Sequence, residues 1–262
     1  MASFFYLLLL EISVDEEKNI KLILQYEGSN YHGWQRQKNG VSIQEVIEEK
    51  LTLIFRRHVT IYGSGRTDSG VHALYQVANF FAETSIPPES IKNALNSLLP
   101  DDIYIKKAEY TVPDFHSRYS AKKKSYEYRI LNTGDADLFL RRYTWHIKEH
   151  LNYIEMKKCL AMIIGVHDFS SFRASGSSNI NPVREMFRAE LSEKDLDGTF
   201  RLTFEASGFL RHMVRNLVGT IIDAGKGKIS EIGFKEILDA HDRKRAGAMA
   251  PAQGLFLKMV EY

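Results

Sequence analysis

The chain has 262 residues, of which 44% are hydrophobic and 26% charged, and its formal net charge is +2. This length suggests one or two domains of about 150 residues each, with a core large enough to fold without disulfides or structural metal. The lone cysteine, Cys159, excludes an intrachain disulfide and a cysteine-based zinc site, and favours a reducing cytoplasm. The nearly balanced charge neither demands nor excludes a nucleic acid partner.

Residues 1–19 are predicted to be an N-terminal extension. The apolar run at residues 4–10 is much shorter than the roughly 18 residues that span a bilayer. No Lys or Arg precedes the run and no small-residue cleavage site follows it, which disfavours a signal peptide. An extra strand or an upstream start codon explains the run better.

Alternation of apolar and polar residues predicts the strands of the first half, and capping residues predict its helices. Strands are expected over residues 20–26, 59–62, 75–81 and 103–109. Ser42 and Glu45 form a capping box that starts a helix ending near Arg57, and Pro88 starts a second helix. A Gly-rich loop follows the short second strand.

The second half has the same mixture of elements. Strands are expected over residues 125–131, 186–191, 200–206 and 255–260, and helices over residues 151–164, 209–224 and 231–240. Gly165 is expected to end the first of these helices. The mixture predicts an α+β fold with largely antiparallel sheet.

The element order in residues 20–109 is that of a ferredoxin-like unit. A related unit in the second half would give two ferredoxin-like, RRM-like lobes that flank a basic catalytic cleft. The predicted lobes are residues 20–112, which carry the Gly-rich loop, and residues 113–262.

The Gly-rich loop, Gly63–Ala73, is the segment richest in chemical groups. Its glycines permit left-handed backbone and close approach of a ligand, although Asp68 followed by Ser69 and Gly70 is also ordinary turn chemistry. The spacing of a phosphate-cradling loop is absent. A metal site on Asp68 and His72 is weak, because no further ligand cluster accompanies the two side chains.

The loop sequence G-R-T-D-S-G-V-H-A resembles the signature of the TruA-type tRNA pseudouridine synthases, with Ser69 in place of the alanine of that pattern. Further segments resemble the family in the same order along the chain. They are Tyr31–Gln37, Ser42–Glu45, Phe115–Arg118, Lys124–Tyr128, Asp168–Arg173, Asn181–Arg184 and Phe209–Asn216. The resemblance runs from about Ile20 to Tyr262.

The resemblance implies an enzyme that converts uridine to pseudouridine at positions 38, 39 and 40 of the tRNA anticodon stem-loop. The N1–C1′ bond breaks, the uracil turns, C5 bonds to C1′, and the C5 proton leaves. The reaction needs no redox step and no group donor, so no cofactor and no metal are expected. The family also implies a homodimer. A non-catalytic tRNA-binding protein on the same scaffold is the alternative, and it predicts loss of Asp68 or its partners.

Three residues are the predicted catalytic group by this resemblance. Asp68 is the required carboxylate, which can attack C1′, attack C6 or remove the 2′ proton of the ribose. Arg215, on the polar side of a predicted amphipathic helix with Asn216, would keep Asp68 ionised and oriented in a fork. Tyr126 would stack on the uracil and accept the C5 proton, either directly or through a relay by water or Asp68, since a phenol with an ordinary pKa of about 10 is a poor base. From the strand pattern alone Tyr128 is equivalent, and the resemblance selects Tyr126.

Flipping the target base out of its stack costs a few kcal/mol, which contacts to the surrounding RNA must offset. Tyr126, Arg66, Arg211, His212, Lys122, Lys123 and Lys124 are the predicted substrate-binding residues. Further candidate phosphate contacts are Arg36, Arg56, Arg57, Arg141 and Arg142. A lysine run is often only a solvated face, and its place just before Tyr126 favours the functional interpretation. His72, Gln44 and Trp34 are expected to shape the loop.

Overall fold

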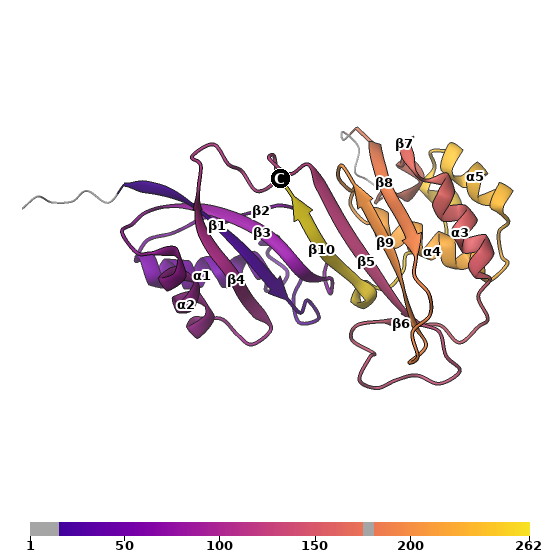
Figure 1. The fold of residues 1–262 in the computed structure, drawn as a ribbon, viewed down its shortest axis with the longest axis horizontal. Coiled ribbons are helices and arrows are strands. Elements are labelled where there is room, and N and C mark those ends of the chain that lie inside the picture. Colours follow the sequence, from indigo (N-terminus) through magenta and orange to yellow (C-terminus); the bar gives the residue numbers. More distant parts are fainter. Residues whose placement is uncertain (1–15, 175–180) are drawn as a thin grey trace, which may run out of the picture.

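One mixed sheet runs through both halves of the chain, which a computed structural model describes over residues 16–174 and 181–262 (Figure 1). The strand order is β4-β1-β3-β10-β5-β9-β8-β7, with β2 paired to β3 and β6 paired to β5. The strands are β1 (Glu17–Tyr26), β2 (Tyr62–Gly63), β3 (His72–Glu83), β4 (Ile103–Thr111), β5 (Lys123–Leu131), β6 (Trp145–His146), β7 (Gly165–Asp168), β8 (Val183–Leu191), β9 (Thr199–Ala206) and β10 (Leu255–Glu261). The α-helices are α1 (Ile43–Phe55), α2 (Pro88–Leu98), α3 (Tyr153–Met162), α4 (Met213–Gly225) and α5 (Glu231–Asp239), and short 3₁₀ helices lie at Ser170–Phe172, Arg243–Arg245 and Ala252–Gly254.

The predicted α+β class with a largely antiparallel sheet is confirmed. Only β10 with β3 and β5 with β6 pair in parallel among the described strands. Helices α1 and α2 pack beside the N-terminal strands, and α3, α4 and α5 pack beside the C-terminal ones (Figure 1). Because one sheet continues through both halves, the boundaries 20–112 and 113–262 stay a prediction. The apolar run at residues 4–10 lies outside the described residues.

Strand β10 occupies the middle of the sheet and joins its two halves. It pairs in parallel with the start of β3 and antiparallel with β5, so that Leu257 faces Ala73 on one side and Tyr126 on the other. Ala73 is the last residue of the Gly-rich loop. The strand therefore fixes this loop at two strand spacings, about 10 Å, from Tyr126.

Most predicted helix ends are confirmed, and one is wrong. The Ser42 hydroxyl accepts a hydrogen bond from the Glu45 amide at 3.2 Å, and Pro88 begins α2. Helix α4 begins at Met213 instead of residue 209, because His212 adopts a left-handed backbone with φ of 64°. Within the described residues, no helix has the length and apolar character needed to cross a membrane.

Short strands are where the sequence pattern failed. The strand expected over residues 59–62 is only Tyr62–Gly63, and β6 and β7 were not predicted. Strands β6 and β7 have two and four residues, which is too short to display an alternating pattern.

Candidate active site

The Gly-rich loop packs against the segment that contains Gly33 and Trp34, which we call the floor of the loop. The Trp34 amide donates to the Thr67 carbonyl at 3.2 Å, and the Tyr26 hydroxyl contacts the Thr67 hydroxyl at 2.8 Å. A Cβ on Gly63 would lie 2.4 Å from the Trp34 ring, so no larger residue fits at this point. These contacts hold the backbone on both sides of Arg66.

Gly33 allows this floor to approach the loop, and its replacement is expected to destabilise the protein. The residue has φ of +84°, and a Cβ there would lie 2.4 Å from the Thr67 carbonyl oxygen. Gly33→Ala should lower the free energy of unfolding by about 2 kcal/mol or more, a fall in Tm of roughly 5 °C. Gly134→Ala is the control, because a Cβ at Gly134 has no atom within 4 Å. Equal melting temperatures for the two variants would contradict this account of the loop.

Asp68 and Arg215 meet in the site, although 147 residues separate them in sequence. The Nη1 atom of Arg215 donates to Oδ2 of Asp68 at 3.2 Å, and its Nε donates to the Ala250 carbonyl at 2.8 Å. Their side chains are 22% and 11% exposed, so Asp68 stays accessible while its partner is largely enclosed. The expected two-pronged fork is wrong: Arg215 divides its donors between Asp68 and the backbone.

His212 is a second neighbour of Asp68, with its Nε2 atom 3.7 Å from Oδ1. Burial lowers the pKa of His212; the Asp68 carboxylate opposes this shift, and the nearby arginines, including Arg211 and Arg215, reinforce it. The imidazole is therefore neutral at pH 7, and its approach to Asp68 is not an ion pair at that pH. Arg215 supplies the positive charge that holds the carboxylate.

Tyr126 and Tyr128 lie on the same face of β5, and their surroundings differ. The Tyr128 hydroxyl donates to the Pro251 carbonyl at 2.8 Å, and its side chain is fully buried. The Tyr126 hydroxyl has no hydrogen-bond partner among the described residues, and its ring meets Phe209 edge-on at 5.0 Å. Burial raises the pKa of Tyr126, and Tyr26 and Asp68 raise it further, so Tyr126 is a neutral phenol close to Asp68.

The other predicted binding residues go to different places. Arg66 and Arg211 are exposed and form no ion pair with any described residue. In the lysine run, Lys122 is exposed, Lys123 pairs with two glutamates on one face of β5, and Lys124 turns to the face that carries Tyr126. The run therefore does not form one continuous patch.

The residues expected to shape the loop do have structural roles. Gln44 accepts hydrogen bonds from Gln35 and from the Arg36 amide at 2.7 and 3.1 Å. The Nδ1 atom of His72 accepts from the Gly28 amide at 3.0 Å, and its Nε2 lies 3.0 Å from the Arg142 carbonyl and 3.1 Å from the Gln253 carbonyl. Both ring nitrogens are thus engaged by the backbone, which leaves neither for a metal site with Asp68.

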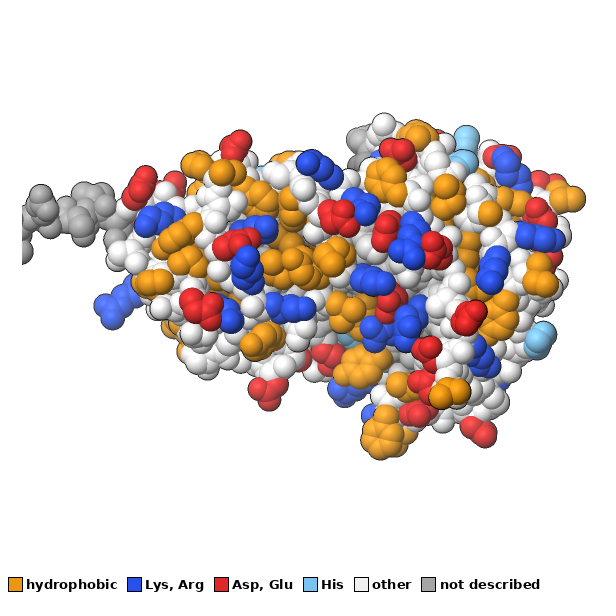
Figure 2. Space-filling model, viewed as in Figure 1, with side chains coloured by type: hydrophobic (Ala, Val, Ile, Leu, Met, Phe, Trp, Pro, Cys, Tyr) orange, Lys and Arg blue, Asp and Glu red, His pale blue; other side chains and the backbone are white. Residues whose placement is uncertain are grey.

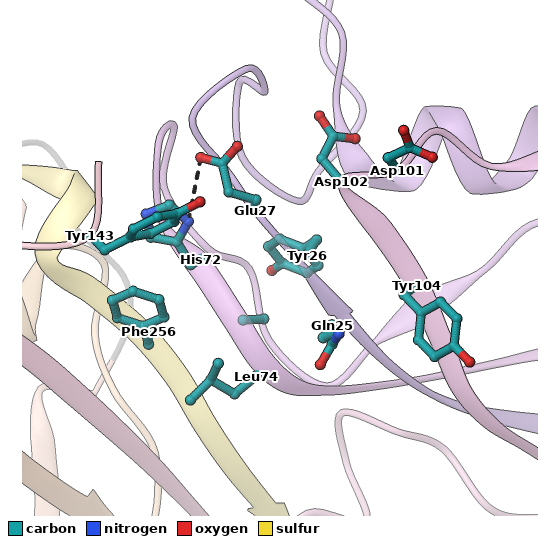
Figure 3. Close-up of a pocket in the computed structure, with 11 residues that line it drawn as sticks. Gln25, Tyr26, Glu27, His72, Leu74, Asp101, Asp102, Tyr104, Tyr143 and Phe256 are labelled. Carbon is teal, nitrogen blue, oxygen red and sulfur yellow. Dashed lines mark ion pairs between the residues drawn. The ribbon is translucent and has the colours of Figure 1, made fainter. Parts of the chain in front are cut away.

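A separate pocket of about 230 Å³ opens at the ends of β1, β3 and β4 (Figure 3). It contains the carboxylates of Glu27, Asp101 and Asp102, and Glu27 lies 3.9 Å from His72. Burial lowers the pKa of His72, which keeps this histidine neutral and the pocket negative. An acidic pocket repels RNA phosphates, and it contains none of the three predicted catalytic residues. In the described parts of the chain, no group of three or more His, Cys, Asp or Glu side chains is placed to hold a metal ion.

Comparison with known proteins identifies the family. The family model described as tRNA pseudouridine synthase matches residues 22–120 and 160–262. The chain belongs to this family. The matched ranges include Asp68 and Arg215.

Curated relatives align over nearly the whole chain. The tRNA pseudouridine synthase A of Thermoanaerobacter sp. (strain X514) is 46% identical over 94% of this chain and the whole of that relative. The protein of the same name from Acetivibrio thermocellus is 43% identical over the same shares. A chain of the solved "Crystal Structure of a Cbf5-Nop10-Gar1 Complex" aligns with 77% of this chain and over 53% of its own length, at 13% identity and a TM-score of 0.32.

The structure adds partners that the sequence analysis did not assign. The Ala250 carbonyl accepts a hydrogen bond from Arg215. Every residue type has a backbone carbonyl, so the sequence does not mark this contact. Asn216, predicted beside Arg215 on the polar side of the helix, is buried and donates to the Phe172 carbonyl at 2.8 Å. Arg118 and Arg184 are near Lys124, and both stand inside segments that resemble the family.

Proposed function

We propose that this protein isomerises uridine to pseudouridine at positions 38, 39 and 40 of the tRNA anticodon stem-loop, as an intramolecular transferase. The observation that carries the proposal is an accessible carboxylate, Asp68, hydrogen-bonded to a largely enclosed arginine beside a neutral tyrosine. Membership of the tRNA pseudouridine synthase family supports the substrate. Substrate and product are isomers: the N1–C1′ bond is replaced by a C5–C1′ bond, C5 loses a proton and N1 gains one. The reaction therefore needs a group that acts at C1′ and a route for the proton that leaves C5.

In this proposal Asp68 is the covalent or basic carboxylate, and Arg215 orients it. Tyr126 provides an aromatic surface for the flipped uracil. Its raised pKa disfavours a phenolate, so a direct role for Tyr126 as the base for the C5 proton needs a relay through water or Asp68. Arg66 and Arg211 contact the surrounding RNA. The neutral His212 would donate a hydrogen bond there without adding charge.

The test measures the proton that leaves C5. Unmodified anticodon stem-loop RNAs, each with one uracil tritiated at C5 at position 38, 39 or 40, are incubated with the wild-type protein. Tritium release from all three RNAs is expected. Release from none would overturn the proposed function, and release from one alone would restrict its site. By family resemblance we also propose that the protein is cytoplasmic and forms a homodimer. A measurement of its mass in solution tests the homodimer.

A further inference from the structure

The two faces of the sheet around β5 and β9 differ in how their cations are paired. On one face, Glu127 and Glu205 neutralise the surrounding basic side chains. Their partners are Lys123, Arg129, Arg188, Arg201 and Lys258. Figure 2 shows acidic and basic side chains interleaved over these strands. Charge on that face is balanced within the protein itself.

Lys124 lies on the opposite face, the one that carries Tyr126, because side chains two residues apart on a strand point the same way. Its ammonium donates to the Ser64 carbonyl. The Nζ atom is also 3.5 Å from the position that a Cβ on Gly65 would take. The charge of Lys124 is therefore placed against the Gly-rich loop, four residues before Asp68.

Two arginines face this lysine. Arg184 follows from the strand register: Lys124 pairs with Ala206, Ala206 pairs with Met186, and Arg184 is two residues from Met186 on β8. Its Nε lies 3.7 Å from the Cβ position of Gly208, the residue before the Phe209 ring that meets Tyr126.

Arg118 lies in a turn near Lys124, close enough to act on its charge. Its neighbour Ser117 is anchored by donating to the Tyr62 carbonyl, one residue before Gly63. Within residues 16–174 and 181–262, no carboxylate lies within ion-pair distance of Lys124, Arg118 or Arg184. This trio of cations, unlike those on the other face, has no acidic partner in the described chain.

The absence of a counter-charge is unfavourable for the free protein. Burial lowers the pKa of Lys124 to about 8, and Arg118 and Arg184 lower it as well. Burial also lowers the pKa of Arg184. Basic side chains that lower one another's pKa are typical of sites that bind a ligand of opposite charge.

We propose that Lys124, Arg118 and Arg184 bind one backbone phosphate of the RNA directly next to the target nucleotide. The inference rests on the proposed function, since it takes RNA as the substrate. Arginine guanidinium groups bind phosphate oxygens through paired hydrogen bonds, and lysine adds a point charge. Because Lys124 also holds the Ser64 carbonyl, the bound phosphate would fix the backbone that leads to Asp68.

The test combines protein variants with RNAs in which one backbone phosphate has lost its charge. Stem-loop RNAs carry one methylphosphonate at a time, at the linkages on either side of the target uridine, and their binding is measured by fluorescence anisotropy. For the wild type, one linkage should lower affinity about 10-fold. In Lys124→Gln, Arg184→Gln and Arg118→Gln the same methylphosphonate should lower affinity less than about 2-fold, because the charge partner is already missing. Lys258→Gln and Arg188→Gln, matched changes on the paired face, should keep the 10-fold loss.

A pH series gives a second readout. The groups facing the Lys124 ammonium are the Arg118 and Arg184 guanidinium groups, which stay charged, and the Ser64 carbonyl, which does not titrate. As the pH rises through about 8, Lys124 loses its proton in the free protein, and the affinity for unmodified RNA falls. Between pH 7 and 8.5 the loss should be about threefold. Lys124→Arg should abolish this dependence and retain affinity. If Lys124→Arg showed the same pH profile as the wild type, the role of Lys124 would be overturned.

Failure of this inference and failure of the proposed function give different results. Because the coupling is measured in binding, it is obtained whether or not isomerisation takes place. Equal methylphosphonate effects in the wild type and in all three variants would overturn the phosphate site even if tritium is released normally. Arg184→Gln and Arg118→Gln leave the Ser64 contact intact, so their result is independent of any disturbance of the loop.

Discussion

Asp68→Asn is expected to abolish pseudouridine formation, with a fall in single-turnover rate on the order of 10⁴-fold. Asparagine keeps the shape of the side chain and its contact with Arg215, but an amide is neither a nucleophile nor a base. Binding of tRNA should persist, because the substitution removes a negative charge from a site that receives phosphates. Tritium release from C5 and binding of the same RNA are measured in parallel.

Asp114→Asn is the matched control, since Asp114 is exposed and has no ion-pair partner in the described chain. It should release tritium at the wild-type rate. Undiminished release by Asp68→Asn would remove Asp68 from the chemistry. Loss of both release and binding would instead indicate that the substitution disturbs the loop.

Isotope labelling can distinguish removal of the 2′ proton by Asp68 from its attack at C1′ or C6. Removal of the 2′ proton breaks the C2′–H bond, whereas attack at C1′ or C6 leaves it intact. Deuterium at C2′ of the target ribose should slow a single turnover, or be lost to solvent, only by the first route. Full retention of the label without any slowing leaves the two routes of direct attack.

Arg215→Lys should lower kcat on the order of 10²-fold while changing KM little. Arg215 donates simultaneously to Asp68 at 3.2 Å and to the Ala250 carbonyl at 2.8 Å, and a single ammonium on a flexible stem cannot hold both at that geometry. Arg215→Met, which also removes the charge, should lower kcat on the order of 10³-fold. Steady-state kinetics with the stem-loop RNA give kcat and KM separately.

Arg188→Lys is the control, because Arg188 lies on the other face of the sheet and pairs with glutamates there. It should leave both kinetic constants within about twofold of the wild type. Thermal melting of each variant checks that the fold is retained. A kcat close to the wild-type value in a folded Arg215→Met protein would show that Asp68 needs no cationic partner.

Much of the fold was predictable because its signals are local. Alternation placed β1, β5 and β9, and Ser42 and Pro88 marked helix starts, whereas α3 ends at Met162, before the expected Gly165. Helix α4 was misplaced because the apolar side chains before Met213 continue the helical spacing, although the backbone turns at His212. Periodicity reports side-chain spacing and does not register a single reversed φ angle.

The site was predictable only in part. No local pattern connects Asp68 to Arg215 across 147 positions, so their pairing came from family resemblance and the distance from the structure. In the sequence, Lys122, Lys123 and Lys124 form a single run, and only the extension of β5 to Lys123 in the structure shows that Lys124 shares a face with Tyr126. The neighbours of Lys124 could not be assigned: Arg184 depends on the pairing of β5, β9 and β8, and Arg118 on the place of a turn, and neither leaves a pattern in the sequence.

The central position of β10 has a consequence for biosynthesis. The ribosome synthesises the loop with Asp68 and the strand with Tyr126 well before residues 255–261, the strand that both must pair with. A nascent chain that lacks β10 would expose the unpaired backbone edges of β3 and β5 to each other, to solvent and to chaperones. Catalytic competence should therefore arise in a single late event during translation, and shortened translation products should carry no partial activity.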